Sequence, residues 1–355
     1  MTPGAKEKPP AGMILEIQRM STEDGPGLRT TVFFKGCPLA CGWCHNPESL
    51  SPRPQVQWTG VGCLGCGACV ETCPNGSLFL DSTGIHIDRR LCDGCGACVD
   101  ECPSGAMELL GTSWNLGDLV NELVKDRTYF EQSDGGITLS GGEATMQPEF
   151  CRALLSELEK QGIRTALDTC GQVSRGVFAT LLPLTDLLLF DLKEIDVEKH
   201  RRFTGRSNEL ILENAVFAAE YIRRHKRPRT FWIRTPLIPG ATATAENIQG
   251  IGAFIAGHLE GTVDRWELCA FNNLCRDKYE RLGIHWDYAP TPLLSREQME
   301  SFAAEARRSG VDPSIVIWSG STLTEDEGRN NKLFEGKAES TSNVIALPGC
   351  GCPIR

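Results

Sequence analysis

The sequence predicts an α/β protein, an open and partial (β/α)6 barrel that carries a cysteine-rich insertion. Short β-branched or aromatic runs alternate with longer amphipathic stretches, which is typical of parallel βα units. Six such units are too few to close an eight-stranded barrel, so we expect an open one. A segment dense in cysteine, residues 60–104, interrupts the alternation after the first strand.

The expected strands and helices follow from these patterns in chain order. The strands are residues 30–34, 137–140, 164–168, 186–191, 231–235 and 266–271. Between them, apolar residues recur every three or four positions in residues 116–129, 148–161, 213–224 and 245–259, which predicts helices. Ligands are expected at the C-terminal ends of the strands, where the βα loops gather.

Three domains are expected from this organisation. The barrel would comprise residues 13–59 and 105–320, and the insertion residues 60–104. Residues 321–355 carry Glu, Asp, Asn, Ser and Gly with only short apolar runs, which predicts a tail that lies on the surface or is mobile.

The composition is that of an ordinary globular protein. With 355 residues and 41% hydrophobic content, the chain can bury a substantial core. A formal net charge of -10 with one short basic run at 223–227 argues against a nucleic-acid partner. No stretch approaches the roughly 18 apolar residues of a membrane-spanning helix, and residues 1–12 lack the apolar core of a signal peptide. We therefore expect a cytoplasmic monomer with no membrane partner.

Seventeen cysteines carry most of the functional information. A disulfide framework is not expected in a reducing cytosol, and the spacings look like metal ligation. Eleven cysteines fall in three tight groups before Pro103, and we expect these to be ligands. The others are expected to be bystanders and are Cys151, Cys170, Cys269, Cys275, Cys350 and Cys352.

The first cysteine group directly follows the first strand as Cys37-Pro-Leu-Ala-Cys41-Gly-Trp-Cys44. Three thiolates at this spacing can hold three irons of a [4Fe-4S] cluster and leave the fourth iron open. A metal with an open position is a substrate site rather than a closed structural one. The alternative is a zinc site completed by His45, and the accompanying motifs decide against it.

This loop resembles the signature of radical S-adenosylmethionine enzymes, and further motifs match in order over roughly residues 13–320. The resemblance implies that the methionine part of S-adenosylmethionine chelates the open iron and that Trp43 borders the adenine. A core tryptophan is the alternative. In Ser140-Gly141-Gly142-Glu143, glycines let the backbone approach a ligand and the carboxylate can pair with an ammonium. This stretch resembles the element of the family that binds the methionine amino group.

The subfamily is indicated by Asp24-Gly-Pro-Gly-Leu-Arg29, which leads into the first strand, and by His45-Asn-Pro-Glu48 after the loop. Alone, Asp-Gly-Pro-Gly is simply a good turn. Together with the cysteine loop, it resembles the opening of activating enzymes for pyruvate formate-lyase and related glycyl radical enzymes. The resemblance implies a glycyl radical enzyme as protein substrate, with Asp24 and Arg29 as candidates for holding its peptide.

Charged residues follow three further strands, and charges at consecutive strand ends converge on a shared site. In glycyl radical activating enzymes the matching motifs contribute to a monovalent-cation site and to cofactor and peptide contacts. The alternative for each residue is a plain salt bridge in a loop. The resemblance implies a cation site at Asp168, Thr169 and Asp191, S-adenosylmethionine contacts from Asp168, Asp191 and Arg234, and a catalytic role for Lys193.

The insertion holds two copies of the bacterial ferredoxin run, C-x2-C-x2-C-x3-C-P, from Cys63 to Pro74 and from Cys92 to Pro103. Zinc bound by eight thiolates is the alternative. Because the fourth cysteine of each run ligates the other cluster, one [4Fe-4S] set is Cys63, Cys66, Cys69 and Cys102, and the other is Cys92, Cys95, Cys98 and Cys73. Such closed clusters suit electron transfer rather than substrate binding.

The function that the resemblance implies is an activase. One electron from a flavodoxin or ferredoxin, passing through the auxiliary clusters, would reduce the first cluster. Cleavage of S-adenosylmethionine would then give a 5'-deoxyadenosyl radical that takes a hydrogen atom from a backbone glycine. The alternatives are a radical enzyme acting on another protein residue or a small molecule, and an electron-transfer protein.

Some residues depart from the pattern of the family. Asn272 stands where shorter activating enzymes carry a histidine, so a role carried over from that histidine is in doubt. Ala144 after Glu143 and Cys170 after Thr169 are variations without an interpretation. The Cys350-Gly-Cys352 pair is expected to be incidental rather than a redox or metal site.

Overall fold

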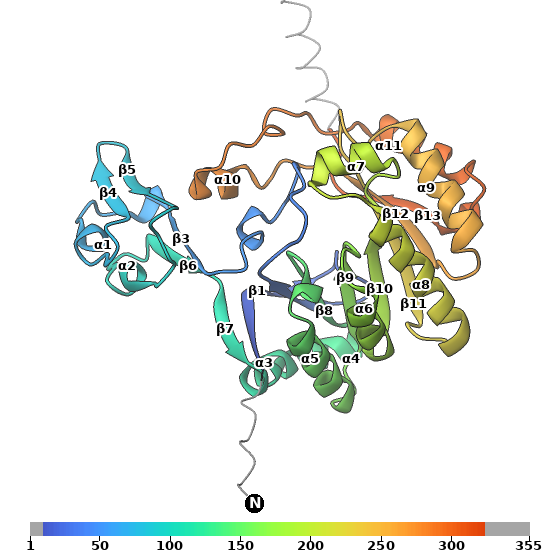
Figure 1. Ribbon diagram of the computed structural model, residues 1–355, viewed down its shortest axis with the longest axis horizontal. Helices are drawn as coiled ribbons and strands as arrows, with labels where there is room; N and C mark the ends of the chain where they lie inside the picture. Colours follow the sequence, from blue (N-terminus) through green and yellow to red (C-terminus); the bar gives the residue numbers. More distant parts are fainter. Residues whose placement is uncertain (1–9, 324–355) are drawn as a thin grey trace, which may run out of the picture.

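The computed structural model describes residues 10–323, and its central feature is a nine-stranded sheet. From β2 to β13 all neighbouring strands are parallel, whereas β1 and β7 extend the sheet in antiparallel fashion. The strand order leaves β7 and β13 at the two edges, so the barrel is open (Figure 1). In spatial order the strands are β13 (Val316–Ser319), β12 (Arg265–Ala270), β11 (Thr230–Leu237), β10 (Leu187–Asp191), β9 (Thr165–Thr169), β8 (Gly136–Gly141), β2 (Arg29–Phe34), β1 (Ala11–Ser21) and β7 (Thr112–Asn115).

The predicted α/β class and the six predicted strands are confirmed. Three further strands of the central sheet were missed, as were the four short strands of the insertion and its neck. β13 is a seventh parallel strand of only four residues. β1 has a mixed exposure pattern rather than a buried run, and β7 is exposed over most of its length. These strands exist because of main-chain pairing with distant segments, which leaves little hydrophobic pattern in the sequence.

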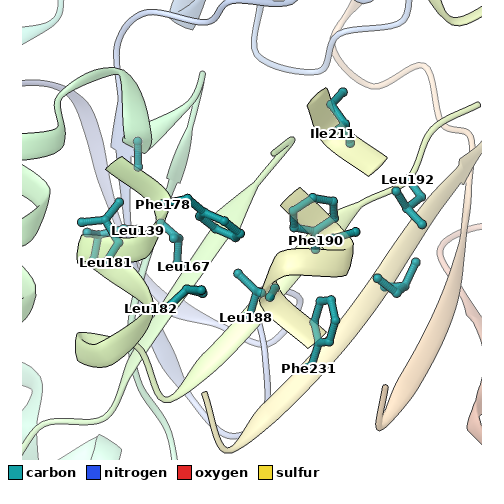
Figure 2. Close-up of a cluster of buried hydrophobic side chains, with 14 of the residues drawn as sticks. Leu139, Leu167, Phe178, Leu181, Leu182, Leu188, Phe190, Leu192, Ile211 and Phe231 are labelled. Atoms are coloured by element: carbon teal, nitrogen blue, oxygen red, sulfur yellow. The ribbon is translucent and has the colours of Figure 1, made fainter. Parts of the chain in front are cut away.

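Helices cover the outer face of the sheet and bury the main hydrophobic core against it. Figure 2 shows Phe178 of α6 and Ile211 of α8 among the side chains of β9, β10 and β11. Ser174 and Thr244 begin α6 and α9, each accepting a hydrogen bond from a main-chain N–H of the first turn. The helices of the barrel are α3 (Leu116–Leu123), α4 (Arg127–Ser133), α5 (Pro148–Lys160), α6 (Arg175–Leu181), α7 (Val197–Thr204), α8 (Glu209–His225), α9 (Ala245–His258), α10 (Arg276–Leu282) and α11 (Arg296–Arg307).

The single helix expected at 116–129 is instead two helices, α3 and α4, joined by a 3-10 turn, Val124–Asp126. The buried carboxylate of Asp126 accepts a hydrogen bond from Thr30 Oγ1 at 2.7 Å and pairs with Arg19. These contacts fix the turn against the sheet, and the chain changes direction there.

The inner face of the barrel changes from apolar to charged along the strands. Alternate residues of a strand point to the same face. In β10, Leu187 and Leu189 join the small inner core of the barrel, and Asp191 comes two residues later at the C-terminal end. In β11, Trp232 likewise precedes Arg234. Polar groups are thereby concentrated at the C-terminal end of the barrel, next to a layer of apolar side chains inside it.

The cysteine-rich insertion forms a separate lobe beside the barrel (Figure 1, left). Its neck is the antiparallel pair β3 (Gln55–Trp58) and β6 (Met107–Leu110), and its own core includes Val56 and Met107, outside the expected range of 60–104. Two short helices and a hairpin complete the lobe: α1 (Ala68–Glu71), α2 (Ala97–Asp100), β4 (Leu78–Asp81) and β5 (Gly84–Ile87).

The described residues include no helix both long enough and apolar enough to cross a bilayer. Residues 324–355, with most of the expected tail and the Cys350/Cys352 pair, lie outside the described residues.

Candidate active site

The loop that carries Cys37, Cys41 and Cys44, called here the cluster loop, extends from the C-terminal end of β2. Main-chain hydrogen bonds fix it on two sides. Gly36 N–H donates to Ser49 O at 2.7 Å, and Ala40 N–H donates to Thr204 O, at the end of α7, at 2.8 Å. The sequence identified the loop, and the structure shows that α7 helps to hold it.

A second support of the cluster loop was not predicted. We call residues 271–294, which follow β12 and include α10, the strap. Tyr279 Oη donates to Cys44 O at 2.8 Å, and Trp286 Nε1 donates to Gly42 O at 2.9 Å. The two rings stack with centroids 4.9 Å apart. The only signal in the sequence was a set of aromatic residues in an otherwise polar stretch.

The strap is also tied to the segment that follows the loop. Lys278 Nζ lies 2.6 Å from Glu48 Oε1 and 3.0 Å from Asn46 Oδ1. His45 Nε2 is 2.9 Å from Asn272 O, so the His45 ring is engaged by the strap. The strap therefore holds the cluster loop and the residues after it as one unit.

The three thiols of the cluster loop are in contrasting electrostatic environments. Burial raises the pKa of Cys41 to about 11 and the pKa of Cys44 further. A hydrogen bond from Cys170 lowers the pKa of Cys37. Thiols whose pKa is this high ionise when a metal is coordinated, because the charge of the metal compensates for burial. These thiols fit an iron-sulfur cluster better than a site left without metal.

The glycines of Ser140-Gly141-Gly142-Glu143 are required for close packing of the chain itself. A Cβ on Gly141 would lie 2.2 Å from Phe34 N, and one on Gly142 would lie 2.4 Å from Gly36 O. Gly141 also has φ of +113°, a conformation that favours glycine. The sequence predicted that Gly141 and Gly142 let the backbone approach a ligand. In the structure they let the backbone pack closely against the end of β2 and the residue before the cluster loop.

This packing places Glu143 beside the cluster loop, with its N–H donating to Gly36 O at 2.8 Å. Its side chain is 1% exposed. Oε1 accepts hydrogen bonds from Thr145 and from Thr169 Oγ1 (2.8 Å), and Oε2 accepts one from Cys170 N–H (2.8 Å). Oε2 retains a free lone pair, which leaves room for one further donor such as an ammonium.

A row of charges crosses the inner face at the C-terminal strand ends. Asp191, Arg234 and Glu267 are register partners on β10, β11 and β12. Arg234 Nη1 lies 3.5 Å from Asp168 Oδ1. The buried Nε lies 3.9 Å from Glu267 Oε2, and it has no hydrogen-bond partner within residues 10–323. Burial raises the pKa of Asp168 to about 6, even though Arg234 opposes this effect. A buried guanidinium with an unused donor fits the binding of an anionic or carbonyl group.

Lys193 connects this charged row to the cluster loop. Its Nζ lies 2.5 Å from Asp191 Oδ2, and its side chain is 12% exposed. Burial alone would lower the pKa of Lys193, but Asp191 and the Cys41 thiol together raise it, so the ammonium form is favoured. Asp168, Asp191 and Thr169, the expected monovalent-cation ligands, are thus all bonded to protein groups here: Arg234, Lys193 and Glu143 respectively.

Trp43 is 6% exposed and packs edge-on against Phe203 (5.9 Å between centroids) and Tyr288 (6.1 Å). As placed, it is part of a small aromatic core that also includes Phe271 and Trp286. Its expected contact with adenine stays a prediction.

The two expected peptide contacts differ in their placement. Asp24 Oδ2 accepts hydrogen bonds from Ser21 Oγ and Thr31 Oγ1, and its charge acts on Asp168 inside the barrel. Arg29 is 2% exposed and donates to Thr138 Oγ1 and to the main-chain oxygen of Ile137. As placed, Arg29 can act on a peptide only by holding the loop that carries Asp24.

The eight cysteines of the insertion line two separate small cavities. We call them the outer site and the inner site. The outer site is lined by Cys63, Cys66, Cys69 and Cys102, and the inner site by Cys73, Cys92, Cys95 and Cys98. These are the sets expected from the ferredoxin spacing.

Within residues 10–323, no three His, Cys, Asp or Glu side chains converge closely enough to hold a single metal ion. A cubane takes one thiolate per iron, so its ligands stand farther apart than those of one ion. Two cavities with four cysteines each, and a loop with three, fit two closed clusters and one open cluster.

Comparisons with known proteins agree with this geometry. Residues 62–108 match the family model of a 4Fe-4S dicluster domain, and residues 102–248 match that of the radical SAM superfamily. Together these models account for three [4Fe-4S] clusters and S-adenosylmethionine as cofactors.

Three curated relatives match most of the chain. The trans-4-hydroxy-L-proline dehydratase activating enzyme of Clostridioides difficile is 36% identical over 85% of this chain and 98% of its own length. The (2S)-3-sulfopropanediol dehydratase activating enzyme of Klebsiella oxytoca is 39% identical, over 78% and 86%. The benzylsuccinate synthase activating enzyme of Thauera aromatica is 35% identical, over 85% and 92%. The chain therefore belongs to the radical S-adenosylmethionine family of glycyl radical enzyme activating enzymes, which cleave S-adenosylmethionine and generate a glycyl radical on a partner enzyme.

Proposed function

We propose that the C-terminal end of the barrel is the place where S-adenosylmethionine and the partner's glycine loop meet. The observation that supports this most strongly is convergence. The cluster loop, the carboxylate of Glu143 and the charges of Asp168, Asp191 and Arg234 lie towards the C-terminal ends of five consecutive parallel strands. Side chains at such strand ends share one site.

Cys37, Cys41 and Cys44 would hold the catalytic cluster, whose open iron supplies the electron that cleaves the carbon-sulfur bond of S-adenosylmethionine. Glu143 would accept a hydrogen bond from the methionine ammonium through the free lone pair of Oε2. Arg234 would donate its unused Nε–H to a carboxylate or to a carbonyl of the peptide. Lys193 would hold Asp191 and stabilise the thiolates of the loop.

The partner peptide would enter through the open side of the barrel, near Asp24, whose main-chain oxygen accepts a hydrogen bond from Thr138 Oγ1 of β8 at 2.8 Å. Arg29 would be a positioning residue for the Asp24 loop. A monovalent cation at Asp168, Thr169 and Asp191 would have to displace the Arg234 and Lys193 contacts and the hydroxyl of Thr169 from Glu143.

The test combines anaerobic reconstitution, iron counting and detection of 5'-deoxyadenosine after reduction with dithionite. About twelve irons per chain are expected from three cubanes, and about eight in Cys41→Ala, which should form no 5'-deoxyadenosine. Cys151→Ala is the matched control. The buried Cys151 thiol of α5 donates a hydrogen bond to Ala144 O and has no expected ligand role, so this variant should keep the iron count and the product unchanged. Product from Cys41→Ala, or eight irons in the wild type, would contradict the proposal.

We further propose a flavodoxin or ferredoxin as electron donor, because two closed clusters in the insertion would suit electron transfer rather than substrate binding. A monomer in the cytoplasm is proposed as well. The fifteen cysteines of the described residues are all free of disulfides, which suits a reducing compartment. Reduction kinetics with a purified ferredoxin and the molar mass in solution test these points.

A further inference from the structure

The outer and inner sites of the insertion have the same ligand spacing but different surroundings. Gly65 and Gly94 hold equivalent places in the two runs, Cys63-Leu-Gly65-Cys66 and Cys92-Asp-Gly94-Cys95. A Cβ on Gly65 would meet nothing within 4 Å, whereas a Cβ on Gly94 would lie 2.3 Å from Pro54 O. The inner site therefore packs against the chain segment that leads out of the cluster loop, and the outer site faces open space.

The surface over the outer site is apolar and without charge. Val61 and Leu64, which flank Cys63, are 101% and 71% exposed. No charged residue occurs between Thr59 and Val70. The outer site is therefore accessible to another molecule, and no barrel residue among residues 10–323 lines it.

Arg89 connects the inner site to the strap. Its guanidinium donates one hydrogen bond to Val56 O in the neck and another to Arg281 O in α10 at 3.2 Å. Arg89 precedes Cys92, a ligand of the inner site, by three residues. Arg89 thus contacts the neck and α10 while its charge lies beside an inner-site ligand.

The contact continues from α10 to the cluster loop. Tyr279, two residues before Arg281, donates to Cys44 O at 2.8 Å, and Lys278 pairs with Glu48. The short helix α10 therefore contacts both Arg89 of the insertion and the loop that would hold the catalytic cluster.

We propose that the two auxiliary clusters work in a fixed order, with the outer site receiving the electron and the inner site passing it to the cluster loop, and that Arg89 couples the inner site to that loop. This inference rests on the proposed assignment of cluster ligands. In each step one reduced cluster loses one electron and the next gains it, with no bond made or broken. The first electron comes from a one-electron carrier protein.

Arg89 is a positioning residue with two separable effects. Its positive charge favours the reduced, more negative inner cluster and so raises its reduction potential. Its two hydrogen bonds to main-chain oxygens hold α10 against the neck, and only a planar fork of donors can make both. A lysine would keep the charge and lose the fork.

The test uses the reconstituted holoenzyme with the variants Arg89→Gln and Arg89→Lys. Arg90→Gln is the control, because Arg90 is adjacent, 89% exposed in its side chain and paired with Asp88. Potentials come from EPR-monitored titration. Intercluster transfer is followed by freeze-quench EPR after mixing with limiting reduced ferredoxin, using the signal that changes on addition of S-adenosylmethionine.

In Arg89→Gln, one auxiliary potential should become more negative, and reduction of the catalytic cluster should slow about thirtyfold, the factor that corresponds to the loss of two hydrogen bonds of about 1 kcal/mol each. Arg89→Lys should restore the potential and remain slow. Arg90→Gln should match the wild type. Wild-type potential and rate in Arg89→Gln, or a fast Arg89→Lys, would overturn the role assigned to Arg89.

The order of the clusters has its own test. Leu64→Asp gives the outer run the residue that the inner run already has at Asp93, so the local fold tolerates it. Because ferredoxins are acidic, the new charge should slow reduction by ferredoxin at low salt about tenfold. Leu91→Asp, at an exposed position before Cys92 (53%), should have much less effect. Equal slowing in both variants would overturn the order.

Dithionite separates these failures from failure of the proposed function. A small reductant reaches the catalytic cluster directly, so every Arg89 and Leu64 variant should still form 5'-deoxyadenosine with dithionite. Loss of that product in the wild type would instead contradict the assignment of the active site.

Discussion

The cluster loop and the insertion differ in how far the protein encloses their cysteines, because only the insertion has exposed ones. Around the cluster loop, α7, the strap and β8 all contribute hydrogen bonds, and burial raises the pKa of Cys41 and Cys44. In the insertion the surroundings are mixed. Cys66 and Cys95 are exposed, and hydrogen bonds with neighbours lower the pKa of Cys73 and Cys102. Burial raises the pKa of Cys69, and it raises the pKa of Cys98 to about 11. A site that generates a radical is enclosed by the protein, whereas a site that exchanges electrons stays accessible.

The largest effect is expected from removing a support of the cluster loop. Tyr279→Ala deletes the ring stacked on Trp286 and the hydrogen bond to Cys44 O. By comparison with other buried aromatic truncations, it should lower the free energy of unfolding by about 3–5 kcal/mol. Irons should fall from about twelve to about eight, with loss of 5'-deoxyadenosine. Tyr129→Ala, at a half-exposed ring, is the control. A twelve-iron, active Tyr279→Ala would mean that the strap does not hold the loop.

A smaller effect should follow from changing the carboxylate that the loop and β8 enclose. Glu143→Gln leaves the three-cysteine loop intact but removes the charge from a buried carboxylate that accepts hydrogen bonds from Thr169 and Cys170. Loss of a charge-assisted hydrogen bond should weaken S-adenosylmethionine binding about 10- to 100-fold with the iron count unchanged. Equilibrium binding measures this, with the exposed Glu149→Gln as control. Unchanged affinity would remove Glu143 from the binding site.

The pH dependence of binding tests the charged row. The pKa of Asp168 is raised by burial to about 6, so the carboxylate takes up a proton as the pH falls through that value. The neutral form no longer pairs with Arg234, and S-adenosylmethionine binding should weaken about tenfold from pH 7 to pH 5. Asp168→Asn should bind weakly at every pH and show no step. If binding by Asp168→Asn still weakened between pH 7 and pH 5, a group other than Asp168 would be responsible for the pH dependence.

The smallest effect is expected in the insertion. Cys66→Ala should remove one auxiliary cluster, leaving about eight irons, while dithionite-driven formation of 5'-deoxyadenosine stays within about twofold of the wild type. The same count of eight irons in Cys41→Ala should abolish the product. If the two variants behave alike, the contrast between the two regions is wrong.

Features that depend on residues close together in the sequence could be predicted. The six strands follow from apolar runs, and the two cysteine sets of the insertion follow from spacing, although ligation itself stays a prediction. The strap could not be predicted, because Tyr279 acts on a carbonyl 235 residues away along the chain. The burial of Arg29 and the reason for Gly141 and Gly142 likewise depend on which strands become neighbours. β1 is a strand because it pairs with β2 and β7, and β7 because it pairs with β1.

The paired strands of the neck have a consequence for how such a chain could arise. Gln55 lies opposite Leu110 and Trp58 opposite Met107, so the insertion leaves and rejoins the barrel at adjacent points. A module whose ends meet can be gained or lost without stretching the host fold. The pairing of β7 with β1 lies on the barrel side of that junction. The ferredoxin-like lobe is thus a cassette, and a shortened gene that joins the two neck strands by a tight turn would encode a single-cluster enzyme.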